Sequence, residues 1–228
     1  MKPLYIPKGK AKEYGDYAVN IYSGCPHRCY YCFAPNVLRR DREEFHSHVE
    51  PRPGIVDALK KQLERESITG QLIHLCFTCD PYPTGYDTSV TREVIKTIKD
   101  SGNHVQIRTK GDGSRDFDLL DGNDWYGITY DGMPHGVYEP SDRVIVLADA
   151  KYAGLKTWVS CEPVIYPEAV LEFIENCYDI IDKVKIGKLN YYPSNTDWKK
   201  FGNEAEQLCQ KLGMDYYIKE SLRKEMEA

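Results

Sequence analysis

Short apolar segments alternate with amphipathic helical segments along most of this chain, and this alternation limits the fold more than any other feature. Six segments rich in β-branched or aromatic residues are predicted strands: 18–23, 72–77, 104–109, 125–130, 156–161 and 183–187. Helices are predicted around them at 55–66, 90–99, 141–153, 167–178 and 197–212. Strands that alternate with helices pair in parallel through right-handed crossovers. The sequence therefore predicts an α/β fold with parallel strands.

The number of strand–helix units narrows the architecture. The chain has 228 residues, fewer than the ~250 of a complete eight-unit barrel. A partial (β/α)6 TIM-like barrel is therefore predicted, with a doubly wound open sheet as the alternative. One domain over residues 1–228 is the expected organisation. The stretch 110–140 is rich in Gly and Asp and is predicted to form turns and loops.

Charge and hydropathy argue against two classes of protein. Lys and Arg number 30 against 35 Asp and Glu, a net charge of -5, which disfavours broad, charge-driven binding to nucleic acid. No apolar run approaches the ~20 residues of a membrane span, and the first ten residues lack the apolar stretch of a secretory signal. We therefore expect a cytoplasmic protein without membrane association.

Three cysteines fall within eight residues in the segment SGCPHRCYYCFAP, residues 23–35. Cys25, Cys29 and Cys32 have the spacing C-x3-C-x2-C and follow the first predicted strand directly. A loop of this kind can place three thiolates around one corner of an iron–sulfur cube. Clusters that only transfer electrons generally take four cysteines, so three leave one iron open for an exchangeable ligand. Open catalytic zinc sites follow the same logic.

Two other interpretations of these cysteines remain open at this point. One is a zinc site completed by His27, although this residue lies between two of the ligands and is badly placed to turn back onto the same metal. Zinc sites usually draw on two separated ligand pairs, and the second close pair here, Cys76 with Cys79, sits at the end of a predicted strand. The other interpretation is three unrelated thiols.

Polar residues end five of the predicted strands. They lie in the segments FTCDPYP (77–83), IRTKG (107–111), GITYDG (127–132), VSCEPV (159–164) and KIGKLN (185–190). Active sites of barrels are built at the carboxyl ends of the strands. A buried polar group needs a partner or a cavity, so five such strand ends together predict a shared cavity.

The cysteine spacing, with the aromatic Tyr31 just before the last cysteine, resembles the signature of the radical S-adenosylmethionine (SAM) superfamily. The wider stretch NIYSGCPHRCYYCFAP, residues 20–35, is similar to the branch that contains spore photoproduct lyase. The resemblance implies a 4Fe-4S cluster on Cys25, Cys29 and Cys32, with SAM chelating the fourth iron. Reduction then cleaves SAM to methionine and a 5'-deoxyadenosyl radical that abstracts a hydrogen atom. It also implies a partial (β/α)6 barrel, in agreement with the strand count.

Candidate SAM contacts come from the strand ends. Lys110 offers a cation to the methionine carboxylate and Thr129 a hydroxyl; the similar photoproduct lyases have a Lys after the third strand and a small hydroxyl residue in the fourth. Acceptors for the ammonium or ribose hydroxyls come from two carboxylates, and Tyr31 offers a surface for the adenine. The predicted cofactor-binding residues are Tyr31, Thr78, Asp80, Lys110, Thr129, Ser160 and Glu162. The chain departs from the superfamily at 78–81, where Thr-Cys-Asp-Pro replaces a Gly-Gly-Glu-like run.

Five further cysteines need an interpretation. Cys76 and Cys79 form a C-x2-C, which suggests a redox pair, a second cluster or a hydrogen-atom donor. Strand alternation separates them onto opposite faces if the strand continues through both. The other three, Cys161, Cys177 and Cys209, are expected to be buried thiols that pack as small apolar side chains, with Cys161 facing the helix layer.

Charged and imidazole side chains near the cluster motif are expected to face solvent. His46 and His48 lie two residues apart in a charged segment with no third metal ligand nearby, which predicts a solvated loop. Arg39, Arg40 and Arg42 are expected to form a modest basic edge or a solvated face.

The sequence thus predicts a radical SAM enzyme of lyase or base- or nucleotide-modifying type. The alternative is an iron–sulfur or zinc binding module for electron transfer or partner recognition, which has no need of polar groups at five strand ends. The expected partners are a reductant such as flavodoxin or ferredoxin, and a nucleotide or single-stranded nucleic acid. Base stacking on aromatic side chains, with 18 Tyr in the chain, would be independent of the net charge.

Overall fold

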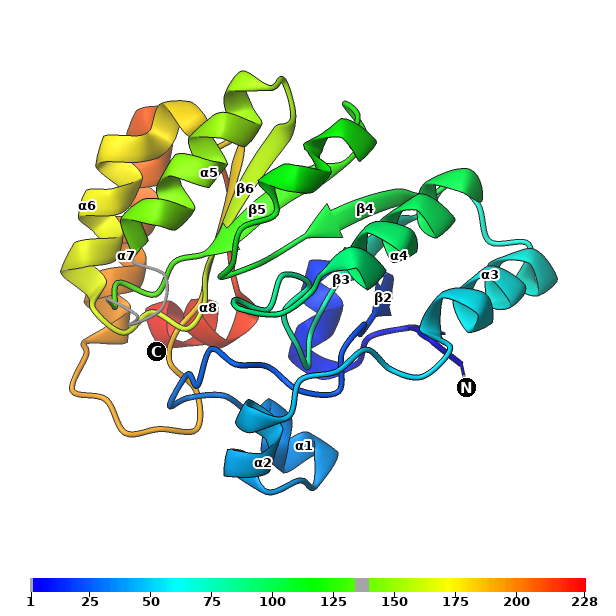
Figure 1. The fold of residues 1–228 in the computed structure, drawn as a ribbon. Helices are drawn as coiled ribbons and strands as arrows, with labels where there is room; N and C mark the ends of the chain where they lie inside the picture. Colours follow the sequence, from blue (N-terminus) through cyan, green and yellow to red (C-terminus); the bar gives the residue numbers. More distant parts are fainter. Residues whose placement is uncertain (1, 134–139) are drawn as a thin grey trace. The chain divides into compact units, whose positions relative to one another are not determined.

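The computed structural model describes residues 2–133 and 140–228, and the chain divides into two compact units (Figure 1). The first unit is Met1–Trp125 and the second is Tyr126–Ala228. Strands and helices alternate in both units, as the hydrophobic periodicity predicts. The single domain over 1–228 stays a prediction.

The sheet of the first unit is mostly parallel. Its strands are β1 (Leu4–Tyr5), β2 (Tyr17–Val19), β3 (Leu72–Leu75) and β4 (His104–Ile107). β1 runs antiparallel to β2, and β2, β3 and β4 run parallel in chain order. In the register Val19 lies opposite Leu75 and Leu75 opposite Ile107, and all three are fully buried. Gln106 of β4 also pairs with Trp125, the first residue of β5 (Trp125–Thr129).

The helices of the first unit are α1 (Ala34–Leu38), α2 (Arg42–Ser47), α3 (Ile55–Glu66) and α4 (Ser89–Asp100), with the 3-10 helices η1 (Gly9–Tyr14) and η2 (Ser114–Leu119). The two long helices, α3 and α4, each bury one apolar stripe. α3 packs against α4 and buries Ile55, Leu59 and Leu63, spaced four apart as one helical face requires. The short α1 and α2 lie beside each other, and the side chain of Asp41 caps α2 by accepting the N–H of Glu44.

The second unit continues the same pattern. β5, β6 (Lys156–Cys161), β7 (Lys183–Ile186) and β8 (Asp215–Ile218) form its sheet. The Tyr130 N–H donates to the Ser160 carbonyl at 3.0 Å, and in the parallel ladders Ser160 lies opposite Lys185, which lies opposite Tyr217. Its helices are α5 (Pro140–Tyr152), η3 (Tyr178–Ile180), α6 (Pro167–Cys177), α7 (Trp198–Leu212) and α8 (Glu220–Glu227). α7 packs against both α6 and α8.

Each predicted strand and helix has a counterpart in the structure. The six predicted strands correspond to β2–β7, and α3 has the predicted bounds. The first strand ends at Val19 rather than Ser23, because the Tyr22 N–H bonds a cysteine sulfur instead of a neighbouring strand. β1, β8, α1, α2 and α8 were not predicted; β1 is two residues long and the exposed face of β8 is polar, so neither gives a clear apolar period. Within 110–140, η2 interrupts the predicted loop, and 134–139 lie outside the described residues.

None of the helices described in the two units combines the length and apolar character needed to cross a bilayer.

Candidate cluster and cofactor site

The cysteine loop follows β2 and packs directly against α2. A Cβ at Gly24 would lie 2.2 Å from the carbonyl oxygen of His48 and 2.6 Å from that of Phe45, so no larger residue fits without movement of the backbone. The next residue, Cys25, donates its N–H to the Phe45 carbonyl at 3.2 Å. The position of the first cysteine is therefore fixed by α2 as well as by β2.

Arg42 of α2 binds the main chain of the cysteine loop. Its guanidinium donates to the carbonyl oxygens of Cys32 at 3.2 Å and Tyr30 at 2.7 Å, and also to that of Cys29. Arg40 donates to the Ser23 carbonyl in the same way. Two members of the expected basic edge thus hold the loop and do not form a free cationic face.

His46 is the second anchor, and the prediction that it lies in a solvated loop is wrong. The ring is buried and its Nδ1 lies 2.8 Å from the carbonyl oxygen of Cys25. A carbonyl only accepts hydrogen bonds, so Nδ1 carries the proton. Burial lowers the pKa of His46, which keeps the ring neutral. His48 is exposed, as expected.

Replacing Arg42 by Ala is expected to lower the iron bound per chain by more than half after anaerobic reconstitution. Three carbonyls lose their shared donor, each bond to a charged group being worth about 1.5 to 3 kcal/mol, and the loop loses the geometry that positions its thiols. Arg39→Ala is the matched control, because Arg39 is an exposed neighbour on α1. Equal iron content in both variants, measured by colorimetric assay, would contradict the anchoring role.

The three thiols of the cysteine loop, Cys25, Cys29 and Cys32, are all free and partly buried. Burial raises the pKa of both the Cys25 and Cys32 thiols, so a cationic group would have to displace their protons.

His27 points from the cysteine loop to the loop after β3. Its Nδ1 lies 3.3 Å from Asp80 Oδ2 and 3.6 Å from Cys25 Sγ, and its Nε2 lies 3.1 Å from Thr84 Oγ1. Imidazole and carboxylate are both nearly buried. His27 therefore connects two loops.

Asp80 is buried, and its two oxygens are bonded within the chain. They accept from the main-chain N–H of Tyr82 at 2.8 Å, from Thr109 Oγ1 at 2.5 Å and from the Lys110 N–H at 2.8 Å. Burial alone would raise the pKa of Asp80, but His27 and these hydrogen bonds outweigh it and lower the pKa. This arrangement favours anchoring of the loop after β4 over the predicted direct contact with SAM.

Lys110 and Tyr31 meet beside the last cysteine. The ammonium of Lys110 hydrogen-bonds the Tyr31 hydroxyl and lies 5.0 Å from the centre of its ring. It is close enough to Cys32 for its charge to act against the rise in the pKa of that thiol. Thr78 lies in the loop that follows β3. Its Oγ1 is buried and has no hydrogen-bond partner among the described residues. These groups fit a polar cofactor that carries a carboxylate.

The remaining predicted contacts lie in the second unit. Thr129 ends β5 and Ser160 lies in β6, and both are buried. Glu162 lies two residues after Ser160, just beyond the end of β6. Glu162 forms an ion pair with Lys219 at 2.5 Å, and only 1% of the Lys219 side chain is exposed. Lys219 was not among the predicted site residues. It directly follows β8, and that strand was not predicted from the sequence.

The cysteines outside the loop form two pairs and one single residue, Cys177, which is half-buried and not buried as predicted. Cys161 is buried close to Cys209 of α7, on the helix side of the sheet as expected. Cys76 and Cys79 do not lie on opposite faces as strand alternation suggested. β3 ends at Leu75, so the alternation stops before them, and the two side chains hydrogen-bond each other.

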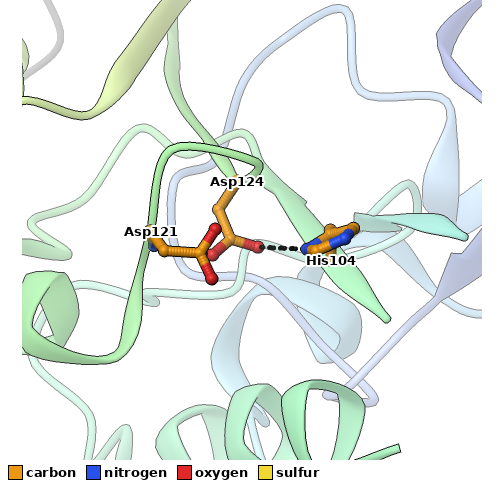
Figure 2. A group of neighbouring side chains, drawn as sticks. All are labelled: His104, Asp121 and Asp124. Carbon is orange, nitrogen blue, oxygen red and sulfur yellow. Dashed lines mark hydrogen bonds and ion pairs between the residues drawn. The ribbon is translucent and has the colours of Figure 1, made fainter. Parts of the chain in front are cut away.

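A second candidate metal centre lies at the amino end of β4, where Figure 2 shows His104, Asp121 and Asp124 close together. Their ligand atoms all lie within 4.8 Å of one another. Lys99 already places its ammonium between the two carboxylates, 2.5 Å from Asp121 and in contact with Asp124. Asp124 also accepts the main-chain N–H of Val105 at 2.7 Å. The group is therefore a set of ion pairs and hydrogen bonds that joins α4, β4 and the turn before β5, and we call Lys99, Asp121 and Asp124 the clasp.

Asp124→Ala is expected to lower the free energy of unfolding by about 2 to 4 kcal/mol, because the buried Val105 N–H loses its acceptor and the partly buried Lys99 loses one of its two carboxylates. Asp121→Ala is the control: this carboxylate is half exposed, and its loss should be worth less than about 1 kcal/mol. Urea denaturation measures both. Similar losses in the two variants would show that the clasp does not depend on Asp124.

The fold can now be compared with known proteins. No known protein-family profile matches the chain. Spore photoproduct lyase aligns with a TM-score of 0.72 at 12% identity, over 94% of this chain and 79% of that chain. SuiB of Streptococcus suis, solved with its precursor peptide SuiA, aligns with a TM-score of 0.65 at 12% identity, over 88% of this chain and 48% of SuiB.

The chain has the fold of spore photoproduct lyase. The predicted resemblance and the partial-barrel α/β class are thereby confirmed. One structure of that lyase holds AdoMet with dinucleoside spore photoproduct, and SuiB has been solved with S-adenosylmethionine. Both are radical SAM enzymes, and this chain shares their fold. In sequence, an uncharacterised protein of Acidianus two-tailed virus is 29% identical over 205 residues, 80% of this chain and 67% of that protein.

Proposed function

We propose that this chain is a radical SAM enzyme with one 4Fe-4S cluster on Cys25, Cys29 and Cys32. The observation that carries the proposal is a C-x3-C-x2-C loop at the carboxyl end of β2 in a fold shared with SAM-binding enzymes. The cluster would supply the electron that cleaves SAM to methionine and a 5'-deoxyadenosyl radical. Three thiolates leave room for an exchangeable ligand, which a binding module would not need.

The chain's own residues divide the work of holding the cofactors. Arg42 and His46 fix the carbonyls of the cysteine loop, and Asp80 fixes the backbone of Lys110. The Lys110 ammonium then orients the carboxylate of SAM, and the buried Thr78 hydroxyl donates to it or to the ribose. We assign the remaining polar contacts to Thr129, Ser160 and Glu162 of the second unit, and an adenine-packing role to Tyr31.

Metal content separates this function from a zinc module. Protein purified without oxygen and reconstituted is expected to be brown, with broad visible absorbance and about four irons per chain. A zinc module would be colourless and would hold about one zinc per chain. Metal analysis by mass spectrometry together with the visible spectrum distinguishes the two, and zinc without iron would refute the cluster.

We further propose a nucleic-acid base or nucleotide as the substrate, in preference to a peptide. The support is the likeness to spore photoproduct lyase, one structure of which holds a dinucleoside spore photoproduct. The likeness to SuiB, solved with a precursor peptide, supports the other class. Net acidity restricts nucleic-acid binding to a small site, because duplex binding needs many phosphate contacts.

Deuterium transfer decides the substrate class. Reduced enzyme is incubated with SAM and, in separate reactions, with deuterated nucleotides, oligonucleotides and peptides, and 5'-deoxyadenosine is analysed by mass spectrometry. We expect deuterium to arrive from a nucleotide or a single strand. Transfer from peptide alone would reject the nucleotide class. A flavodoxin or ferredoxin is the proposed physiological electron donor.

A further inference from the structure

Cys76 and Cys79 lie outside the cysteine loop and take no part in the proposed SAM contacts. The two residues between them, Phe77 and Thr78, donate their main-chain N–H groups to Oδ1 of Asn20, at 2.7 and 2.9 Å. The side-chain amide of Asn20 thus fixes the turn that brings Cys79 close to Cys76. As a result, the two side chains hydrogen-bond each other.

The two thiols have different surroundings. Cys76 is fully buried, and burial raises its pKa well above the usual range. Cys79 is half-buried, and its Sγ accepts the N–H of Tyr22 at 3.4 Å. Burial alone would raise the pKa of Cys79, but hydrogen bonds from Cys76 and Tyr22 and the charge of Arg52 outweigh it and lower the pKa. Cys79 is therefore the thiol of the pair that loses its proton more readily, and Cys76 is the one that retains it.

A cleft lies next to this pair. It is lined by Lys2, Pro3, Tyr5, Asn20, Arg52 and Ile55. Tyr5 is close to both thiols: burial, followed by the nearby cysteines, raises its pKa to about 12. Arg52 Nε donates to the carbonyl of Tyr22, at 3.2 Å, and so its position is tied to the residue that holds the Cys79 sulfur. Two cations are among its lining residues: Arg52, and Lys2, whose ammonium lies 3.4 Å from Glu66. The cleft therefore suits a small molecule that carries a carboxylate beside Arg52.

The Cys76–Cys79 pair differs from the other pair of neighbouring cysteines in the chain. Cys161 and Cys209 are also neighbours, yet burial raises the pKa of both. At Cys79, in contrast, a main-chain N–H and a thiol hydrogen-bond the sulfur of a half-buried residue, and the charge of Arg52 acts on it as well. Nucleophilic cysteines are found in electropositive, partly exposed surroundings of this kind.

We propose that Cys79 and Cys76 form a redox-active dithiol that exchanges with low-molecular-weight disulfides carrying carboxylates. The Cys79 thiolate attacks one sulfur of the disulfide, whose S–S bond breaks, and the departing thiolate takes up a proton. Cys76 then loses its proton and attacks Cys79 Sγ in the mixed disulfide, which releases the second thiol. The Cys76–Cys79 pair is oxidised by two electrons, and the small disulfide is reduced to two thiols.

The test is made on the purified full-length chain, without oxygen, with oxidised glutathione as the probe and peptide mass spectrometry as the readout. We expect a Cys76–Cys79 disulfide in the unmodified chain. Cys76→Ser should accumulate glutathione on Cys79, because the resolving thiol is missing. Cys79→Ser should leave Cys76 unmodified. Glutathione on Cys76 in that variant, or no disulfide in the unmodified chain, would overturn the proposal.

A second measurement needs no variant. Limited alkylation at pH 7 should label Cys79 at least about tenfold faster than Cys177, since the thiolate is the nucleophile. Cys177 is a matched reference, because it is also half-buried but burial raises its pKa. Equal labelling rates would contradict the assignment of Cys79 as the thiol that loses its proton more readily. Both measurements are independent of SAM cleavage, so their failure leaves the proposed enzyme function untouched.

Discussion

Replacing any one of Cys25, Cys29 and Cys32 by Ala is expected to reduce the iron content from about four per chain to a small fraction of one. Each thiol would supply one of only three protein bonds to the cluster, and the other five cysteines of the chain lie outside this loop. The visible absorbance should fall in proportion. Because the buried apolar residues of the first unit lie mainly on its strands and on α3 and α4, outside the cysteine loop, the far-UV circular dichroism should be retained.

Cys177→Ala is the matched control for these variants. Cys177 is a half-buried thiol at the end of α6, and its loss should leave both iron and absorbance unchanged. A full cluster in all three single variants of the loop would mean that other residues hold the metal. Loss of the circular dichroism signal in the loop variants would instead mean that the loss of iron follows unfolding.

The second large effect is expected for Lys110→Ala, which should weaken SAM binding by about 1 to 3 kcal/mol, roughly 5- to 150-fold. The ammonium beside Tyr31 and Cys32 is the group we assign to the SAM carboxylate. The main-chain N–H that bonds Asp80 survives the substitution, so the loop after β4 should keep its position. Isothermal titration of the cluster-loaded protein measures the affinity.

Lys96→Ala tests whether a lost lysine charge in itself weakens binding. Lys96 is an exposed residue of α4 paired with Glu93, and its variant should bind SAM like the unmodified chain. If Lys110→Ala also binds normally, the carboxylate contact belongs to another residue.

The sequence was most informative where a residue pattern repeats along an element. The four-residue spacing of Ile55, Leu59 and Leu63 locates α3 correctly, and the β-branched runs locate β2–β7. These patterns report burial, which the whole element shares. Short elements such as β1 and α1 contain too few residues to show a period, so they escaped prediction.

The supports of the site could not be predicted in the same way. Arg42 and His46 bind main-chain carbonyl oxygens of the cysteine loop. Every residue has such a carbonyl, so the sequence does not show which of them bind a side chain. The charges of Arg42 and His46 instead suggested a solvated segment. The sequence does contain one signal of this packing, Gly24, which lies immediately before the first cysteine. A larger side chain at this position would clash with the main chain of α2, so the glycine indicates that this helix packs on the loop.

The location of Asp80 could be predicted from the sequence, but its hydrogen-bond partners could not. Its place after a strand identified it as part of a polar strand end, and the structure does bring it to the cysteine loop through His27. The residues that bond its oxygens, Thr109 and Lys110, come from the next strand end. Only the register of β3 and β4 places these groups together.

Formation of 5'-deoxyadenosine tests the central claim most directly. Cluster-loaded protein is reduced with dithionite in the presence of SAM, and the products are separated by liquid chromatography and identified by mass spectrometry. We expect 5'-deoxyadenosine and methionine from the unmodified chain, and neither above background from Cys29→Ala. Reduced protein that contains a full cluster and binds SAM, yet yields no 5'-deoxyadenosine with any nucleotide or peptide present, would contradict the radical SAM function.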